Sequence, residues 1–271
     1  NFSTFVYKNK LKRKIPTIRN SWSKLGFIKK ELVNPTKINS ECKIYSGVHD
    51  SNACYFLYQK LYQKKFTLIS TGTWIVIFNQ TMKTKYLDEK KEIFSKLNVF
   101  GQKVPVIRFM GGREFSTILK NFKIKNPLNK IDIKYYLKHN IYPIPSFANG
   151  GPNKNKKGKI INKKLLKSKD DLYILASLYV ALFTDYCLDL VDSKNTLIID
   201  GGFVENKFFL YFLSIFRNKQ LILVNKDSNG TAKGAFLLCN KNVKLKLNFE
   251  KLKRNSNNDL ICYKKEWRKQ I

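Results

Sequence analysis

The sequence predicts an α/β protein, and three patterns carry that prediction. Residues 196–199 form a short apolar run that leads through two glycines into a helical stretch over 204–217. A second apolar run at 221–224 is followed by another helical stretch, over 231–238. Between positions 66 and 78, two β-branched and aromatic runs flank a Thr-Gly-Thr turn. Strands that alternate with helices are typical of a sheet covered by helices.

The first 45 residues show no sustained period. Basic residues are mixed with Pro16 and Pro35, which favours connector and surface structure. From position 46 the pattern changes, because the Ser46-Gly47 step is followed by apolar residues in a helical rhythm. Asp50 or Ser51 is the expected N-cap of that helix.

The hairpin comes next along the chain. Residues 66–70 and 74–78 are the expected strands, and Thr71-Gly72-Thr73 is the turn that carries hydroxyls at the tip. Beyond the hairpin the pattern weakens. Residues 115–122 are expected to be helical, and the polar, breaker-rich stretch 149–159 predicts an exposed insertion.

A long apolar stretch over 172–191 approaches the length of a membrane span. Asp185 and Asp189 lie in its last third, which favours a helix buried in a protein core. We therefore expect no membrane partner.

Composition bounds the function without naming it. Of the 271 residues, 43% are hydrophobic and 14% aromatic, which excludes a disordered chain. The formal net charge is +33, and such an excess indicates nucleic acid when it gathers in a patch. Here the lysines are spread from Lys8 to Lys269 among many Asn, Ile, Phe and Tyr residues, which favours a bias toward A/T-rich codons. Nucleic acid is thus an unlikely partner, but a basic nucleic-acid-binding module stays open as an alternative.

The cysteines and the first residues bear on localisation. Five widely spaced cysteines, without a C-x-x-C pair, predict neither a zinc site nor a disulfide framework. No signal-peptide pattern follows Asn1. We expect a cytoplasmic protein, and a start without methionine that reflects truncation of a longer product.

Three short motifs could carry chemistry, although each has a structural explanation as well. Asp50, beside His49, could accept a proton or could cap a helix. Thr71-Gly72-Thr73 could cradle phosphate oxygens or could be a simple turn. Asp200-Gly201-Gly202, with Asn206 in the following helix, allows close approach of a ligand or is a plain strand-to-helix turn.

Together the motifs resemble the FGGY family of carbohydrate kinases. The likeness rests on Gly47-Val48-His49-Asp50-Ser51-Asn52-Ala53, on Ser70-Thr71-Gly72-Thr73-Trp74, and on Asp200-Gly201-Gly202 with Asn206. Lys233-Gly234-Ala235 and the closing Tyr263 and Trp267-Arg268 agree with it. The His-Asp pair is most similar to rhamnulokinase-like and fuculokinase-like members, and the resemblance spans roughly residues 15–268.

The resemblance implies an actin-like, ribonuclease H-like architecture of two lobes with ATP between them. Asp50 would be the catalytic base that deprotonates a sugar hydroxyl, and His49 would touch the substrate. Thr71-Gly72-Thr73 would hold the ATP phosphates. Gly201-Gly202 and Asn206 would border the adenosine.

The resemblance also implies a division of the chain into three segments. Residues 1–45 would be a connector and the end of the N-terminal lobe, 46–245 the nucleotide-binding C-terminal lobe, and 246–271 a basic C-terminal tail. The substrates would be Mg²⁺-ATP and a ketose, deoxyketose or related polyol. The metal-associated aspartate would belong to the missing N-terminal lobe, so no metal ligand is expected in this chain. The fragment alone would be inactive, and a non-catalytic half-kinase remnant is a further alternative.

Overall fold

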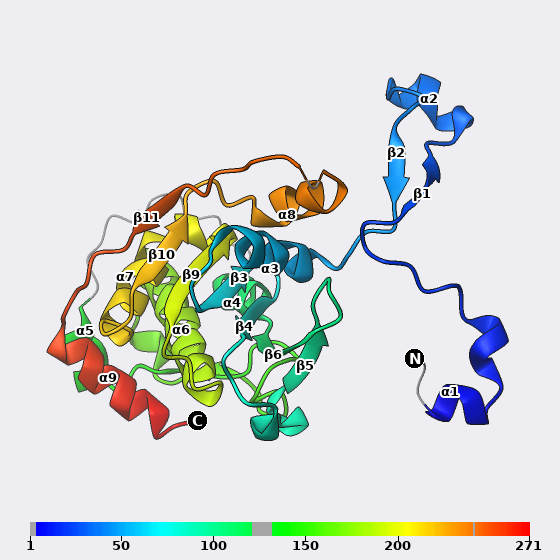
Figure 1. Ribbon diagram of the computed structural model, residues 1–271. Coiled ribbons are helices and arrows are strands. Elements are labelled where there is room, and N and C mark those ends of the chain that lie inside the picture. Colours follow the sequence, from blue (N-terminus) through cyan, green and yellow to red (C-terminus); the bar gives the residue numbers. More distant parts are fainter. Residues whose placement is uncertain (1–3, 121–131, 241) are drawn as a thin grey trace.

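The computed structural model describes residues 4–120, 132–240 and 242–271 (Figure 1). Its centre is a seven-stranded sheet in the order β11-β10-β9-β3-β4-β6-β5. Strands β3, β9 and β10 are parallel, whereas β4, β6 and β5 continue the sheet in antiparallel pairs and β11 closes the other edge antiparallel to β10. The strands are β3 (Phe66–Thr71), β4 (Ile75–Asn79), β5 (Ile93–Leu97), β6 (Lys103–Phe109), β9 (Thr196–Gly201), β10 (Ile222–Asn225) and β11 (Phe249–Lys251).

Two short antiparallel pairs lie outside this sheet. They are β1 (Lys24–Phe27) with β2 (Lys43–Tyr45), and β7 (Pro143–Ile144) with β8 (Lys159–Ile160).

Helices cover both faces of the sheet. Apolar residues of α3 and α8 pack on one face, while those of α4, α6, α7 and α9 form the larger core on the other. The helices are α1 (Thr4–Lys8), α2 (Lys30–Thr36), α3 (Asp50–Leu61), α4 (Gly111–Leu119), α5 (Ile133–Lys138), α6 (Lys169–Leu190), α7 (Lys207–Phe216), α8 (Gly230–Cys239) and α9 (Asn258–Arg268). Five short 3₁₀ turns complete the described elements: η1 (Leu11–Lys14), η2 (Thr84–Tyr86), η3 (Glu89–Lys91), η4 (Lys163–Leu165) and η5 (Gly202–Glu205).

Most predicted elements are present at nearly the expected positions. The hairpin is β3 and β4, and the two strand-to-helix units are β9 with α7 and β10 with α8. The helix expected over 115–122 begins earlier, at Gly111, and ends at Leu119, while residues 121 and 122 lie outside the described part of the chain. The stretch 149–159 is only partly exposed, because Gly150 and Gly151 are buried.

Helix α6 is the buried core helix that the sequence predicts. Ser168 caps it by accepting the amide hydrogen of Asp171 at 3.1 Å. In the described residues it is the one helix long and apolar enough to cross a membrane, and 83% of its most apolar window is buried inside the protein.

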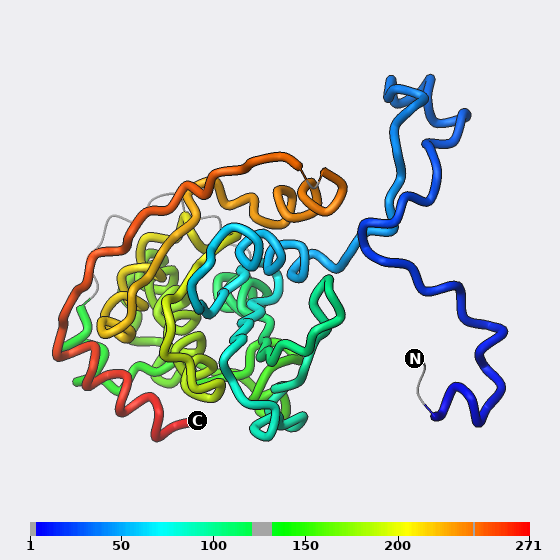
Figure 2. Tube along the Cα trace, viewed as in Figure 1, coloured from blue at the N-terminus to red at the C-terminus, as the bar shows by residue number. Residues whose placement is uncertain are grey.

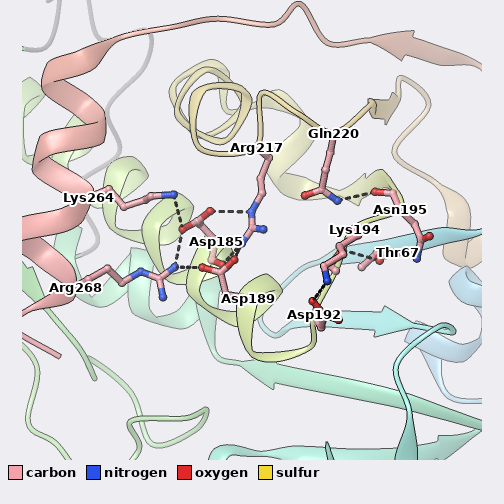
Figure 3. Close-up of polar contacts among 11 residues, drawn as sticks. Thr67, Asp185, Asp189, Asp192, Lys194, Asn195, Arg217, Gln220, Lys264 and Arg268 are labelled. Carbon is pink, nitrogen blue, oxygen red and sulfur yellow. Dashed lines mark hydrogen bonds and ion pairs between the residues drawn. The ribbon is translucent and has the colours of Figure 1, made fainter.

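The acidic residues near the end of α6 hold two other helices (Figure 3). The Asp185 carboxylate is buried and lies 2.8 Å from Arg217 Nε on α7 and 2.6 Å from Arg268 on α9. Lys264 of α9 lies 3.3 Å from the same carboxylate. A buried carboxylate needs such partners, so these charges fix the ends of α6, α7 and α9 together.

Helix α3, which begins at Asp50, is held against α8 by close backbone contact. A β-carbon added to Gly234 of α8 would lie 1.9 Å from the carbonyl oxygen of Ala53. No side chain fits there, so the glycine is what lets the two helices meet. This contact fixes the position of the first turn of α3.

Residues 4–45 project from the body of the protein (Figures 1 and 2). They carry α1, α2 and the β1–β2 pair, and none of these residues is buried. Several large apolar side chains in this segment are exposed, among them Phe5, Ile18, Leu25 and Phe27.

Residues 246–271 differ from the basic tail expected of them. They contribute β11 to the edge of the central sheet and α9 to the core, and Leu260, Tyr263 and Trp267 are fully buried. The high lysine content hid an apolar face at helical spacing, which is what docks α9.

Candidate active site

A cleft of about 230 Å³ opens at the carboxyl end of β3, which pairs with β9. These strands are parallel and in register, with Thr71 opposite Gly201, so their carboxyl ends meet at one edge of the sheet. In open α/β sheets this edge is where ligands bind. The cleft is lined by His49, Asp50, Ser51, Ser70, Thr71, Gly72, Thr73, Trp74, Val76, Lys96, Arg108 and Thr231.

Asp50 begins α3 without capping it. The N-cap residue is His49, and it makes no side-chain capping bond. The Asp50 side chain is 76% exposed, lies 2.8 Å from His49 Nδ1, and accepts the Ser51 amide hydrogen at 2.5 Å. His49 Nδ1 also lies 3.0 Å from the Ser51 hydroxyl. The carboxylate is therefore oriented by its neighbours and open to a ligand.

At the hairpin tip, one hydroxyl is buried and bonded within the protein, and the two residues that follow it are exposed. The Thr71 hydroxyl is buried, donates to the Asp200 carbonyl at 2.7 Å and accepts the Phe203 amide hydrogen at 3.1 Å. Gly72 and Thr73 are exposed. Thr71 thus joins the hairpin to the turn after β9. The Gly72 amide donates to the Trp74 carbonyl at 3.0 Å, so the exposed Thr73 side chain is the group at the tip that can meet a ligand.

The start of α4 supports the hairpin from behind. A β-carbon on Gly112 would lie 2.2 Å from the Gly72 carbonyl oxygen, so only glycine fits. The Arg113 amide donates to the Thr73 carbonyl at 3.3 Å. The Gly-Gly pair that opens α4 therefore positions the hairpin tip.

The glycine turn after β9 lies beside the hairpin but does not line the cleft. Gly201 has a φ of +95°, and a β-carbon there would lie 1.9 Å from the Thr71 carbonyl oxygen. Gly202 is exposed, and a β-carbon there would meet no atom within 4 Å. Gly202 therefore borders open space over which a flat ligand could lie.

Asn206 serves the fold. Its side-chain oxygen accepts the Phe209 amide hydrogen at 2.9 Å and caps α7, and its nitrogen donates to the Ser177 hydroxyl at 3.0 Å. Only 7% of the residue is exposed. Its predicted contact with adenosine stays a prediction, and both polar atoms already have protein partners.

Asp200, the residue before the glycine pair, is a buried anchor. Tyr58 of α3 donates to its carboxylate, and Asn225 donates to it at 3.0 Å. A β-carbon on Gly230, the first residue of α8, would lie 2.0 Å from the same carboxylate. Burial and the charge of Asp200 raise the pKa of the Cys54 thiol well above its usual range. Asp200 thus ties β9 to the helices that carry Asp50 and Thr231.

Two cations in the cleft were missed by sequence reasoning. Lys96 on β5 donates to the Ser51 hydroxyl at 3.0 Å. The Arg108 guanidinium on β6 lies 4.7 Å from the Trp74 ring and donates to Glu92 at 3.1 Å. One signal was present, because Arg108 interrupts an apolar stretch three residues before the glycine pair Gly111-Gly112. Nothing local marked Lys96 among so many lysines.

A buried carboxyl lies behind the hairpin on α4. Glu114 accepts the Phe147 amide hydrogen at 3.0 Å and a hydrogen bond from the Tyr179 hydroxyl. Burial raises the pKa of Glu114 to about 7, and those hydrogen bonds oppose the rise.

In the part of the chain that the structure describes, no three His, Cys, Asp or Glu side chains lie close enough to hold a metal ion. The exposed Thr73 and the open space at Gly202 leave room for a ligand.

Comparison with protein families decides the family. The model of the carbohydrate kinase FGGY C-terminal domain matches residues 63–246, more than half of the chain. The chain belongs to the FGGY carbohydrate kinase family. The match begins after Asp50, so the proposed base lies outside it. No curated protein matches the chain significantly.

Solved structures agree on the fold. A carbohydrate kinase from Novosphingobium aromaticivorans matches with a TM-score of 0.76 and 23% identity, over 99% of this chain and 60% of that one. A xylulose kinase from Lactobacillus acidophilus matches with a TM-score of 0.73 and 15% identity, over 100% and 59%. Glycerol kinase from Plasmodium falciparum, solved with ADP, matches with a TM-score of 0.60 and 18% identity, over 94% and 55%.

These matches confirm the predicted α/β, actin-like ATPase fold of an FGGY kinase C-terminal domain. The chain spans about 60% of the length of the first two structures.

Proposed function

We propose that this chain is the C-terminal lobe of an ATP-dependent kinase that phosphorylates a hydroxyl of a ketose, deoxyketose or related polyol. The observation that carries the proposal is the exposed Asp50 carboxylate, which lines one cleft with the hairpin tip Gly72-Thr73. A base and a phosphate cradle in one cleft are what transfer to an alcohol requires.

In this proposal Asp50 accepts the proton of the sugar hydroxyl. The hydroxyl oxygen attacks the terminal phosphorus of ATP, and ADP leaves. His49 orients the carboxylate and reaches the sugar. Gly72 and Thr73 receive the phosphates, and Thr71 acts through the Gly201-Gly202 turn by holding it to the hairpin. Gly202 borders the adenosine. Mg²⁺ would arrive with the phosphates and neutralise their charge.

A second lobe completes the enzyme in this proposal. Phosphoryl transfer depends on positioning and on charge neutralisation, so half of a clamp should give negligible turnover. Support comes from segment 4–45, where several large apolar side chains are exposed among the residues that the structure describes. The rhamnulokinase-like or fuculokinase-like subgroup and a cytoplasmic site are further parts of the proposal.

The test is a calorimetric titration of ATP into this chain and into Gly202→Val. A β-carbon at Gly202 meets no protein atom within 4 Å, so the variant should fold while its side chain fills the space proposed for adenosine. We expect the affinity for ATP to fall about tenfold or more, a loss of about 1.4 kcal/mol or more. Gly26→Val is the matched control, because its β-carbon also meets nothing and it lies on β1.

A short DNA duplex is titrated in parallel. If ATP binds the parent chain and Gly26→Val but not Gly202→Val, the kinase proposal stands. Binding of DNA without ATP would instead favour the basic nucleic-acid-binding module, and the net charge would then be functional.

A further inference from the structure

We propose that the acceptor substrate carries an anionic group, a carboxylate or a phosphate, which Lys96 and Arg108 bind beside Asp50. This inference rests on the proposed kinase function and narrows its substrate class. It would favour a sugar acid or a sugar phosphate over a neutral ketose.

Lys96 presents a positive charge at the cleft. Its side chain is half-buried on β5, and its ammonium donates to the Ser51 hydroxyl at 3.0 Å. Within the described residues, no carboxylate lies within 4 Å of that ammonium. An ammonium has three hydrogens to donate, so Lys96 retains capacity for a ligand.

Arg108 is held in a fixed orientation by its neighbours. Its guanidinium lies 4.7 Å from the centre of the Trp74 ring and 5.1 Å from the centre of the Phe94 ring. Glu92 accepts from Nε alone at 3.1 Å, and the same carboxylate is shared with Lys154 at 2.9 Å. In the described part of the chain no side chain takes the two terminal nitrogens. A stacked guanidinium with a free fork is suited to bidentate recognition of a carboxylate or phosphate.

The positive charges of Lys96 and Arg108 are unfavourable so close together in a half-buried site. Burial and the like charge of Arg108 lower the pKa of Lys96, and only the charge of Asp50 opposes this. Glu92 cannot neutralise both Arg108 and Lys154. A bound anion would relieve this repulsion in a site partly removed from water, where charges interact strongly.

The position of the cations favours the acceptor as the source of the anion. Lys96 contacts the residue next to Asp50, and both cations line the cleft that contains His49 and Asp50. The residues proposed to border adenosine, Gly201, Gly202 and Asn206, do not line that cleft. The cations therefore lie in the cleft of the proposed base, apart from the glycine turn proposed to border adenosine.

The test compares related acyclic polyols that carry or lack an anionic group. D-gluconate, sorbitol 6-phosphate and neutral sorbitol are titrated into the ¹⁵N-labelled chain, and shifts of the Ser51 and Trp74 amides are followed by NMR. We expect the two anions to bind about tenfold or more tightly than sorbitol, as one charge-assisted hydrogen bond would give. The anion that binds more tightly shows whether the recognised group is a carboxylate or a phosphate.

Variants assign the effect to the named residues. Lys96→Gln and Arg108→Gln should each remove most of the preference for the anions, and Lys96→Arg should keep it. Lys103→Gln is the control, because Lys103 is an exposed lysine at the start of β6 and lies outside the cleft. Thermal unfolding of each variant shows whether the fold is retained.

Three outcomes overturn the proposal. If sorbitol binds as tightly as the anions, or if no acceptor binds, Lys96 and Arg108 do not read charge on the sugar. If inorganic phosphate binds, ATP displaces it and gluconate does not compete, the cations serve the ATP phosphates. Binding of ATP in the same samples reports on the kinase function separately, so the two failures are distinguishable.

Discussion

At the scale of the residue, the site separates side chains that the fold uses from those it leaves free. Asp50 opens α3, yet its carboxylate is 76% exposed and caps nothing. Thr71 and Asn206 differ from Asp50, because both side chains are buried. The Thr71 hydroxyl and the Asn206 side-chain amide each donate one hydrogen bond and accept another within the protein. The Thr71 hydroxyl and the Asn206 amide are therefore positioning groups, and Asp50 is the group available for chemistry.

Asp50→Asn tests that assignment in the full two-lobe enzyme. The variant should lose roughly 10²–10⁴-fold in kcat, the usual contribution of a general base, while ATP affinity stays unchanged. Its melting temperature should not change, because the side chain is exposed. Asp192→Asn is the control, since Asp192 is an exposed aspartate paired only with Lys194 and should turn over normally. Unchanged kcat in Asp50→Asn would remove Asp50 from the role of base.

At the scale of the element, α4 shows how a helix supports a loop that carries function. Gly112 touches the Gly72 carbonyl at one end of the helix, and Glu114 one half-turn later is anchored to α6 through Tyr179 and to the segment of Phe147. The hairpin tip therefore rests on a helix whose own position depends on a buried carboxyl.

The protonation of Glu114 makes stability depend on pH. Its pKa rises from 4.5 to about 7 on folding, chiefly because of burial. Between pH 4.5 and pH 7 the Glu114 carboxyl holds a proton in the folded protein that it has released in the unfolded chain. The contribution of Glu114 to stability is therefore fully present below pH 4.5 and is lost as the pH rises toward 7. Urea unfolding at pH 5 and pH 8 should show this loss, on the order of 3 kcal/mol.

Glu114→Gln should remove this loss, because the amide does not ionise. Glu205→Gln, at an exposed position, should keep the pH profile of the parent chain. Equal profiles for the parent and Glu114→Gln would mean that Glu114 is already ionised in the folded protein at pH 5.

At the scale of the whole molecule, charge and burial are arranged differently from what composition indicates. The chain carries a formal charge of +33, yet its C-terminal basic stretch closes the core. Trp267 of α9 is fully buried and donates to the Pro143 carbonyl at 2.6 Å, and Tyr263 donates to the Ile141 carbonyl at 2.6 Å. Around this face, Arg268 and Lys264 neutralise Asp185 (Figure 3).

Trp267→Ala measures how much the packing of α9 against the core contributes to the stability of the protein. Truncation of a large buried aromatic residue should lower the free energy of unfolding by about 3–5 kcal/mol, measured by urea denaturation. Phe236→Ala on α8 is the control, because Phe236 is 47% exposed and its loss should cost about 0.5 kcal/mol or less. A small effect at Trp267 would instead favour the basic tail that the sequence predicts for 246–271.

The sequence by itself determined the α/β alternation, the hairpin at 66–78 and the order of the three motifs, because hydrophobic period and glycine position are local properties. From these came the family and the candidates His49, Asp50, Thr71-Gly72-Thr73 and Gly201-Gly202. Tertiary structure alone decided which polar groups remained free, since Thr71 and Asn206 are bonded by residues far away in the chain.

Tertiary structure also brought Lys96 and Arg108 to the cleft. They lie on strands β5 and β6, and only the antiparallel order of the sheet carries them beside the first turn of α3. It likewise turned the basic stretch 246–271 into a docked strand and helix, because burial depends on which face of α9 meets the core. The number of lysines along the chain carries no such information.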